Sequence, residues 1–396
     1  MKFIHFGCWG ELNKTTKVIN VLQNIKHYVD TNPDTIKFIT IAGDNYYPKK
    51  EKLTISNTDK NTEYKVKIYN NLQLNQLMDY LKNVSIPKYL LWGNHDMLDK
   101  TITPIEWEVS NRLPNIEERI ITIENQYKKE CMVINGQLDW IKNNDKQIIP
   151  FKQVIINLSF PNTLILMIDT TIYEEDEYSK CYNTNNIFDS KNNKYNIDNL
   201  RNIQLSQIIQ ALMSNVTQKH IIFIGHHPIK SWKKKGIVIT THLYSLFSNL
   251  TNFLTNKTIY YLCADTHLYQ HSKLYINNNT LPYNTITIEQ FVVGTGGAET
   301  DKLGKLTEKS YGFPVDNIDD RYDIMIYEQK KEHGFLVCEY REHVDQWFFS
   351  FQGGIIPDTT GGKKKYNRNQ KKTKTKTKKH KTKTKTKHCM VNTIKL

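Results

Sequence analysis

Five short apolar runs in this sequence each end in residues that could bind a metal ion. The clusters that follow them are Gly7-Cys8-Trp9-Gly10, Gly43-Asp44-Asn45-Tyr46-Tyr47, Gly93-Asn94-His95-Asp96, Gly225-His226-His227-Pro228 and Ala264-Asp265-Thr266-His267. Their carboxylate, amide and imidazole groups suit Zn, Fe or Mn rather than a soft thiolate cluster. Four of the five clusters begin with glycine, which lets the backbone turn sharply toward a ligand. The pattern predicts a metal site.

The expected position of these clusters also predicts a type of chemistry. Open α/β sheets bind ligands at the carboxyl edge of their strands, so the clusters are expected to meet there. Two metal ions about 4 Å apart can clamp both the attacking and the leaving oxygen of a phosphate ester. One carboxylate can bridge such a pair, and Asp44 is predicted to do so.

The segments that must position these clusters predict a layered α/β domain. Alternating elements are predicted at residues 2–6 (strand), 15–28 (helix), 36–41 (strand), 67–81 (helix) and 89–92 (strand). Residues 50–63 are interpreted as a polar loop. This β-α-β-α-β order is typical of sheets covered by helices.

The remainder of the body is predicted to be less regular. Residues 100–150 are interpreted as helices and loops, and 173–199 as a long polar loop. Further elements are predicted at 154–158, 163–168, 220–224, 258–263 and 288–293 (strands), 200–213 (helix) and 334–351 (hairpin).

The positive charge of the chain lies in its C-terminal tail. The net charge is +14, and residues 363–387 contain 14 Lys and Arg without an acidic residue. Outside 363–396 there are 39 basic and 40 acidic residues, which argues against a nucleic-acid-binding body. The Lys/Thr tail lacks apolar residues and is predicted to be disordered. A solvating role, polyanion or nucleic-acid contact through 363–387, and a nuclear localisation signal stay open as its function.

Cysteine usage and hydropathy predict an intracellular, cytoplasmic protein without membrane contact. The six cysteines are scattered and form no CxxC pair, so no disulfide framework is expected. The N-terminal residues do not resemble a signal peptide. No run approaches the roughly 18 apolar residues of a membrane-spanning helix.

The ordered motifs GDNYY, GNHD, GHHP and a final TH resemble those of the calcineurin-like phosphoesterase family. The GCWG start, the tyrosine after GDN, MIDTT at 167–171 and GFL at Gly334 are most similar to the small purple, or tartrate-resistant, acid phosphatases. The resemblance implies a four-layer αββα sandwich of mixed β-sheets over residues 1–352, followed by the tail 353–396. It also implies a metal-dependent phosphomonoesterase acting on a small molecule or a phosphoprotein.

The resemblance further implies which residues hold two metal ions, divalent or mixed-valence Fe, Mn or Zn. Asp44 would bridge the two ions. Tyr47 and His267 would hold the first ion, and Asn94 and His226 the second.

Two further residues receive a catalytic role from the same resemblance. His95 would protonate the leaving alcohol or steady the phosphate, and Asp96 would fix the ring of His95. A metal-bound hydroxide would attack the phosphorus atom in line.

Two positions depart from the pattern of the family. Cys8 stands in GCWG where the family usually has the aspartate of GDWG, a ligand of the first metal. Asp265 stands in Ala264-Asp265-Thr266-His267 where the family usually has the first histidine of GHxH. A thiolate keeps the charge of the lost aspartate, and a carboxylate is a hard donor, so both remain predicted ligands. Asp265 favours Mn²⁺ or Mg²⁺ over Zn²⁺, and Cys8 disfavours a ferric tyrosinate centre.

Structural interpretations stay open beside the functional ones. Cys8 could be a small buried residue and Tyr47 a packed tyrosine. His227 is interpreted as a supporting or loop histidine, with substrate contact as an alternative. For the whole chain, the alternatives to a phosphomonoesterase are a catalytically degenerate domain that binds a phosphorylated ligand or has a structural role, and a phosphodiesterase or nuclease tethered to nucleic acid by the tail.

Overall fold

The computed structural model describes residues 1–11, 15–47, 49–57, 60–68, 71–96, 132–150, 155–156, 160–174, 188–189, 194–195, 197–233, 236–277, 285–303 and 324–354. The chain divides into two units, Met1–Ile356 and Pro357–Leu396, and all described residues belong to the first. The basic tail therefore lies outside the described residues, and the division into a domain at 1–352 and a tail at 353–396 stays a prediction.

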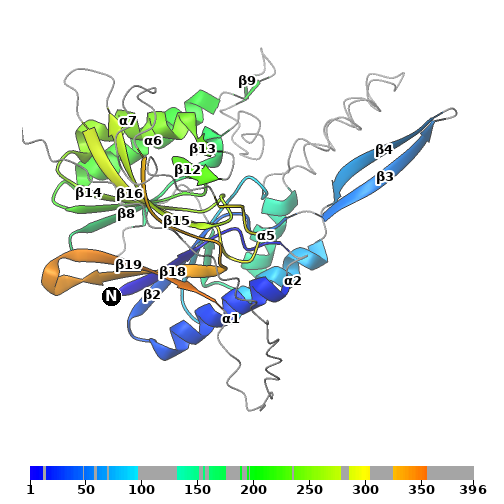
Figure 1. Ribbon diagram of the computed structural model, residues 1–396, viewed down its shortest axis with the longest axis horizontal. Coiled ribbons are helices and arrows are strands. Elements are labelled where there is room, and N and C mark those ends of the chain that lie inside the picture. Colours follow the sequence, from blue (N-terminus) through cyan, green and yellow to red (C-terminus); the bar gives the residue numbers. More distant parts are fainter. Residues whose placement is uncertain are drawn as a thin grey trace, which may run out of the picture. The chain divides into compact units, whose positions relative to one another are not determined.

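Two mixed β-sheets form the centre of the first unit (Figure 1). The first sheet has the order β19-β18-β1-β2-β5-β6. Its strands are β1 (Lys2–Phe6), β2 (Ile36–Ala42), β5 (Lys88–Leu91), β6 (Ile148–Pro150), β18 (Gly334–Arg341) and β19 (Gln346–Gly353). Strands β1, β2, β5 and β6 run parallel, whereas β18 and β19 are antiparallel to their neighbours.

The second sheet has the order β17-β15-β16-β14-β11-β8-β7. Its strands are β7 (Ile155–Ile156), β8 (Thr163–Met167), β11 (His220–Ile224), β14 (Thr258–Cys263), β15 (Tyr269–Asn277), β16 (Thr285–Val293) and β17 (Ile324–Lys330). Strands β8, β11, β14 and β16 are parallel. Strands β11 and β14 are uninterrupted apolar runs that are buried along most of their length, as expected for parallel strands covered on both faces.

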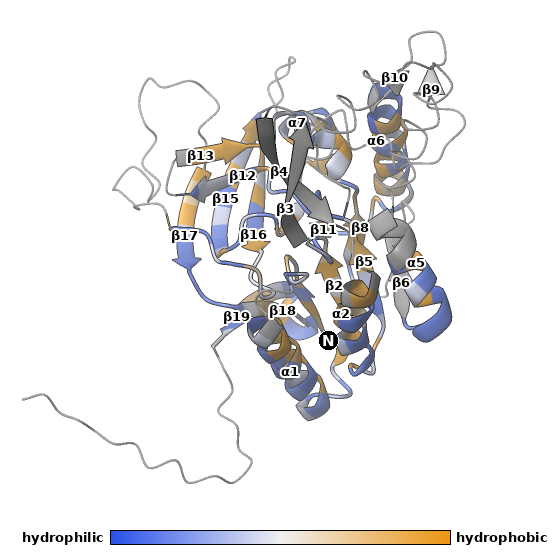
Figure 2. Cartoon of the chain, turned by 90° about the vertical axis from the view of Figure 1, so that its right-hand side faces the viewer, coloured by the Kyte–Doolittle hydropathy of each residue, from blue (hydrophilic) through white to orange (hydrophobic). Residues whose placement is uncertain are grey.

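Helices cover the outer face of each sheet. Helices α1 (Thr15–Thr31), α2 (Asn71–Lys82) and α5 (Met132–Asn144) lie beside the first sheet, and α6 (Ile197–Ser214) and α7 (Thr241–Leu254) beside the second (Figure 1). In Figure 2, α1 and α6 each combine hydrophobic and hydrophilic residues, which is the amphipathic pattern of a helix covering a sheet. The predicted four-layer αββα arrangement of mixed sheets is confirmed.

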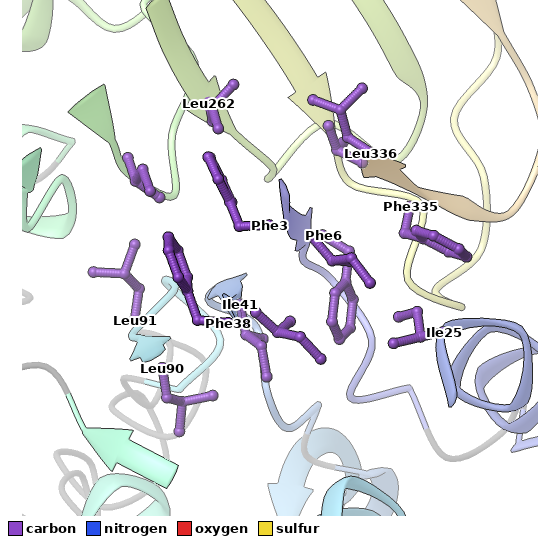
Figure 3. Packing of buried hydrophobic residues seen from close by; sticks show 14 of the residues in the cluster. Phe3, Phe6, Ile25, Phe38, Ile41, Leu90, Leu91, Leu262, Phe335 and Leu336 are labelled. Atoms are coloured by element: carbon purple, nitrogen blue, oxygen red, sulfur yellow. The ribbon is translucent and has the colours of Figure 1, made fainter. Parts of the chain in front are cut away.

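Aromatic side chains pack across the space between the two sheets. Phe349 of β19 packs on Tyr260 and Phe291 of the second sheet, with ring centroids 4.9 and 4.3 Å apart. Phe3 stacks on Phe38 at 4.8 Å within the first sheet, and both lie in the cluster shown in Figure 3. Such interlocked rings fix the distance and angle between the sheets, and so fix where their strand ends meet.

Short elements complete the described structure. They are β3 (Lys49–Asn57) paired with β4 (Lys60–Ile68), β9 (Phe188–Asp189) with β10 (Lys194–Tyr195), β12 (Lys230–Lys233) with β13 (Gly236–Ile239), and the 3₁₀ turns η3 (Thr171–Tyr173) and η6 (Glu342–Val344). No helix among the described residues is long and apolar enough to cross a membrane.

The predicted loop at residues 50–63 is wrong, because β3 and β4 form an antiparallel hairpin there. Leu53 and Ile55 alternate with polar residues, as do Tyr64 and Val66, and this period of two is a strand pattern that the abundant lysines obscured. Since β4 extends to Ile68, α2 begins at Asn71 rather than at residue 67. Parts of the predicted loops at 100–150 and 173–199 lie outside the described residues.

Candidate metal centre

The strand ends that carry the predicted ligands meet at one place between the two sheets. Three backbone hydrogen bonds link these ends. Gly7 N donates to Val293 O at 3.1 Å, Cys8 N to Gly43 O at 3.1 Å, and Ala264 N to His226 O at 2.8 Å. The first of these joins β1 of one sheet to the end of β16 of the other. The ends of β1, β2, β11 and β14 are therefore held in fixed positions relative to one another.

Two glycines allow the loops to approach as closely as they do. A Cβ atom at Gly93 would overlap the Asp44 carboxylate and would lie 2.7 Å from Cε1 of His226. Gly43 has a φ of 76°, and a Cβ atom there would lie 2.5 Å from the Gly93 nitrogen. Both positions therefore require glycine for the carboxylate and the imidazole to come together.

Asp44 lies at the centre of the cluster and is 1 % exposed. Its Oδ1 accepts a hydrogen bond from His95 N at 3.0 Å and lies 3.4 Å from Nε2 of His226. Its Oδ2 accepts a hydrogen bond from the Tyr47 hydroxyl at 2.7 Å and lies 3.7 Å from Sγ of Cys8. Burial opposes ionisation, but the charges of His226 and His95 hold the pKa of Asp44 well below its usual range.

His226 presents a nitrogen lone pair to the cluster. Its Nδ1 lies 2.5 Å from the carbonyl oxygen of Ala42, which can only accept, so Nδ1 carries the proton. Nε2 then faces two acceptors, Oδ1 of Asn94 at 3.2 Å and Oδ1 of Asp44 at 3.4 Å. These three atoms converge on one point, and either the second proton of an imidazolium or a metal ion can lie between them.

His267 is arranged in a similar way on the opposite side of Asp44. Its Nδ1 donates to Glu299 O at 2.8 Å, and its backbone N donates to Oδ2 of Asp301 at 2.9 Å. Nε2 lies 2.9 Å from the Tyr47 hydroxyl, which also contacts Asp44. The single proton of Tyr47 can serve only one of these two acceptors at a time.

A cation fits this site because acceptor atoms outnumber the protons between them. Two groups of possible ligands have donor atoms within 4.8 Å of one another, namely Cys8–Asp44–His226 and His226–His227–Asp265. Each ligating histidine in a metalloprotein characteristically donates its other ring N–H to a carbonyl or carboxylate, as both His226 and His267 do here. The donor set is thus suited to divalent metal ions.

Cys8 and Asp265, the two positions that depart from the family pattern, both lie in the cluster. Cys8 is fully buried, and burial together with the charges of Asp44 and Asp265 raises the pKa of its thiol well above the usual value. The surroundings of Cys8 therefore favour the neutral thiol, and a nearby cation would favour the thiolate. Asp265 is less buried and lies beside His226 and His227.

His95 and Asp96 follow β5 and have different surroundings. The ring of His95 packs on Tyr47, with centroids 4.4 Å apart. Both oxygens of the buried Asp96 accept hydrogen bonds, from Gly93 N at 2.8 Å, from Gln137 Nε2 at 2.8 Å, and from the N and Nδ2 atoms of Asn45. Burial and then the charge of Asp44 raise the pKa of Asp96 to about 7. The predicted role of Asp96 in fixing the His95 ring stays a prediction.

A second set of residues lies behind His226, and only one of them, His227, receives a role from the sequence, as a supporting or loop histidine. The Thr170 hydroxyl accepts the backbone N–H groups of His226 and His227, each at 2.9 Å. His227 lies 2.6 Å from Glu174 through Nε2, and burial, which lowers its pKa, is outweighed by Glu174, so that the pKa rises to about 9. The doubled histidine of GHHP and the MIDTT segment were signals for this set, whereas nothing in the sequence singled out Glu174.

The predicted ligands lie in one cluster. Comparison with known proteins shows the family to which the chain belongs. The family model for calcineurin-like phosphoesterases matches residues 1–269, which contain all of the candidate site residues. The chain belongs to this family. Members of the calcineurin-like phosphoesterase family bind divalent metals and act on phosphoesters, in agreement with the ligand groups found here.

Other comparisons give the fold but no closer relationship. Among solved structures, the chain is similar to GAP50, described as the anchor in the inner membrane complex of Plasmodium, with a TM-score of 0.51 and 13% sequence identity. The similarity covers 90% of this chain and 87% of that chain. No curated protein matches the sequence.

Proposed function

We propose that this calcineurin-like phosphoesterase is a phosphomonoesterase similar to the small purple acid phosphatases and that it uses two metal ions. Asp44 would hold both ions, and Cys8, Tyr47 and His267 would hold the first. Asn94, His226 and Asp265 would hold the second. The observation that carries this proposal is the excess of acceptor atoms around Asp44, where Nε2 of His226 faces two oxygens at 3.2 and 3.4 Å.

The residues of the chain have separable tasks in this proposal. The bound ions supply Lewis acidity toward the phosphate group and activate water at neutral pH. Asp44 fixes the loop after β5, because it accepts the backbone N–H of His95 at 3.0 Å. This contact and the packing on Tyr47 hold the His95 ring at the site, where it donates a proton to the departing alkoxide.

The test combines metal analysis with an aryl phosphate assay. Protein purified without chelators is expected to contain about two metal ions per chain and to hydrolyse p-nitrophenyl phosphate. His95→Ala should lower kcat by about 10²–10⁴-fold while metal content is kept. Asp44→Asn should lose metal and activity together. His271→Gln is the matched control, since His271 lies on β15 next to Glu289 and outside the cluster.

Metal near zero, or a His95→Ala variant with unchanged kcat, would overturn the proposal. The second candidate function would then be favoured, a degenerate domain that binds a phosphorylated ligand without cleaving it. The observation behind this alternative is the fully buried Cys8, which stands where the family resemblance leads to a carboxylate. Polyanion contact through 363–387 concerns residues outside those described and stays a prediction. A cytoplasmic or nuclear location also stays a prediction.

A further inference from the structure

The loop that follows β16 lies against the first metal position. It begins with the run Gly-Thr-Gly-Gly at Gly294 and is described as far as Leu303. Residues 294–298 are buried, whereas Glu299 and Leu303 are exposed. The family model ends at residue 269, so membership of the family assigns no role to this loop. Its contacts have to show what it does.

The buried half of the loop packs on the turn that carries Cys8. Gly296 N donates to Gly7 O at 2.9 Å, and Ala298 N donates to Cys8 O at 3.0 Å. A Cβ atom at Gly296 would lie 2.5 Å from the same Gly7 oxygen, so this close approach requires glycine. The loop therefore fixes the backbone of one candidate ligand of the first position.

The other half of the loop holds His267, another candidate ligand of the first position. Asp301 N donates to His267 O at 2.8 Å, and Oδ2 of Asp301 accepts the N–H of His267 at 2.9 Å. The ring Nδ1 of His267 lies 2.8 Å from Glu299 O, which leaves Nε2 directed at the Tyr47 hydroxyl. Three contacts thus fix the backbone and the ring of His267 together.

The contact from Oδ2 of Asp301 depends on the type of residue, because a side chain makes it. Lys233 of β12 is another neighbour of this oxygen, but its Nζ lies 3.6 Å away, against 2.9 Å for His267 N. A separation of 3.6 Å is too long for a hydrogen bond, and partly exposed ion pairs contribute little to stability. The Asp301 carboxylate therefore acts mainly on the backbone of His267.

We propose that Asp301 is a positioning residue of the first metal position. Through the loop after β16 it fixes His267 relative to Cys8, so that side chains from the ends of β14 and β1 reach the same ion. This inference rests on the proposed two-metal site. Because the contacts of the loop given above are with ligands of the first position, loss of Asp301 should weaken that position selectively.

The test measures metal binding to the full chain rather than activity. Zn²⁺ and Mn²⁺ binding to the metal-free protein is followed by calorimetry, and Co²⁺ binding by its visible absorption. Asp301→Ala is expected to weaken one of the two sites by about 10–100-fold, the usual effect of removing a partner behind a ligand, and to leave the other unchanged. Asp301→Asn keeps an oxygen that can accept the N–H of His267, so it should stay within about threefold of the wild type.

Two controls separate positioning from charge and from stability. Lys233→Met removes the other neighbour of the Asp301 carboxylate and should change neither site. Asp345→Ala removes a carboxylate that accepts the Tyr340 hydroxyl at 2.6 Å and pairs with Lys219 at 2.7 Å, outside the cluster. It should lower the free energy of unfolding without changing metal affinity.

A double-mutant cycle tests whether Asp301 acts through His267. In the His267→Ala background, Asp301→Ala should cause little further loss of affinity. Equal affinity of Asp301→Ala and the wild type, an additive loss in the double variant, or an Asp301→Asn variant as weak as Asp301→Ala overturns the inference. A wild type that binds no metal overturns the proposed function itself, so the two failures are distinguishable.

Discussion

Three candidate ligands adopt a left-handed backbone conformation although none of them is glycine. The φ angles of Cys8, Asp44 and Asp265 are 54°, 53° and 51°, and each residue stands just beyond the end of a strand. Such conformations cost roughly 1–3 kcal/mol and persist where a functional geometry requires them. Two of the three are the positions at which the chain departs from the family pattern, so the backbone at these positions still has the form that directs a side chain into the site.

At the first metal position the decisive residue is Cys8. Cys8→Asp introduces a carboxylate, which gives up its proton much more readily than a thiol, and aspartate tolerates a positive φ better than most residues. It is expected to increase metal affinity at the first position by about tenfold or more, whereas Cys8→Ala should decrease it by a similar factor. Titration calorimetry with Zn²⁺ and Mn²⁺ measures both changes.

Cys8→Ser provides the isosteric control in that series. A serine keeps the size of the side chain but replaces the soft sulfur with a hydroxyl, so it should resemble Cys8→Ala for Zn²⁺. If all three variants bind metal as the wild type does, Cys8 is only a small buried residue, which is the structural interpretation of this position.

The sequence predicted best those site residues that directly follow an apolar run. Asp44, Asn94, His226 and His267 each follow an apolar run, and the structure brings them together. The contacts of Gln137 with Asp96 and of Glu174 with His227 could not be predicted, because the partners lie far apart in the sequence. Such partners depend on the packing of whole elements, which periodicity and motif spacing do not specify.

Among the elements, α5 has a direct connection to the candidate site. Gln137 is fully buried and donates from Nε2 to Oδ1 of Asp96 at 2.8 Å. Asp96 in turn binds Gly93 N and Asn45 N, so it joins the loop after β5 to the loop after β2. The helix thereby supports the loops that carry Asp44 and Asn94.

Gln137→Leu should weaken this connection. The substitution removes one donor from a buried carboxylate, and an unsatisfied buried group of this kind costs about 1–3 kcal/mol. Denaturant unfolding measures the loss of stability. Leu138→Ala changes the adjacent, 36 % exposed position and should cost much less. Equal losses in the two variants would show that Gln137 contributes only to the packing of α5.

The predicted and observed elements agree best where the strands are fully buried. The predictions at 220–224 and 258–263 coincide with β11 and β14, because their uninterrupted apolar runs have abrupt polar ends. Helix α7 was not predicted, although Leu243, Phe247, Leu250 and Leu254 follow helical spacing, since Ser, Thr and Asn fill the rest of the segment. Strands β15 and β17 were missed for a related reason, because polar residues are frequent in them.

For the molecule as a whole, the interface between the two sheets contains a buried titratable group. His5 of β1 lies 2.9 Å from the Thr40 hydroxyl and 3.3 Å from Cys263 O of the second sheet. Burial lowers the pKa of His5 to about 4, although the Cys263 carbonyl acts in the opposite direction. The folded protein therefore keeps this ring neutral at pH values where the unfolded chain protonates it.

The consequence is a loss of stability in acid. Between pH 6.5 and about 4 the unfolded chain binds a proton at His5 that the folded chain does not, so unfolding becomes more favourable as the pH falls. The contribution is present in full above pH 6.5 and decreases by roughly 3 kcal/mol on passing to pH 4. Urea unfolding of the wild type and His5→Asn over this range should show a difference in stability that changes with pH.

His27→Gln is the control for the pH series, because His27 is exposed on α1. Its stability relative to the wild type should not change with pH. If the difference between His5→Asn and the wild type is also constant, the ring of His5 does not stay neutral in the folded protein.

The candidate ligands come from both sheets, with Asp44 and Cys8 on the first and His226 and Asp265 on the second. A bound ion would thus act as a cross-link between two sheets that are also joined by side-chain packing and by hydrogen bonds such as that of Gly7 N to Val293 O. An ion present at about 100 times its dissociation constant adds about 2.7 kcal/mol to the stability of the form that binds it. The stability of the folded chain would then fall with the local metal supply, so metal scarcity would shorten the lifetime of the protein as well as reduce its activity.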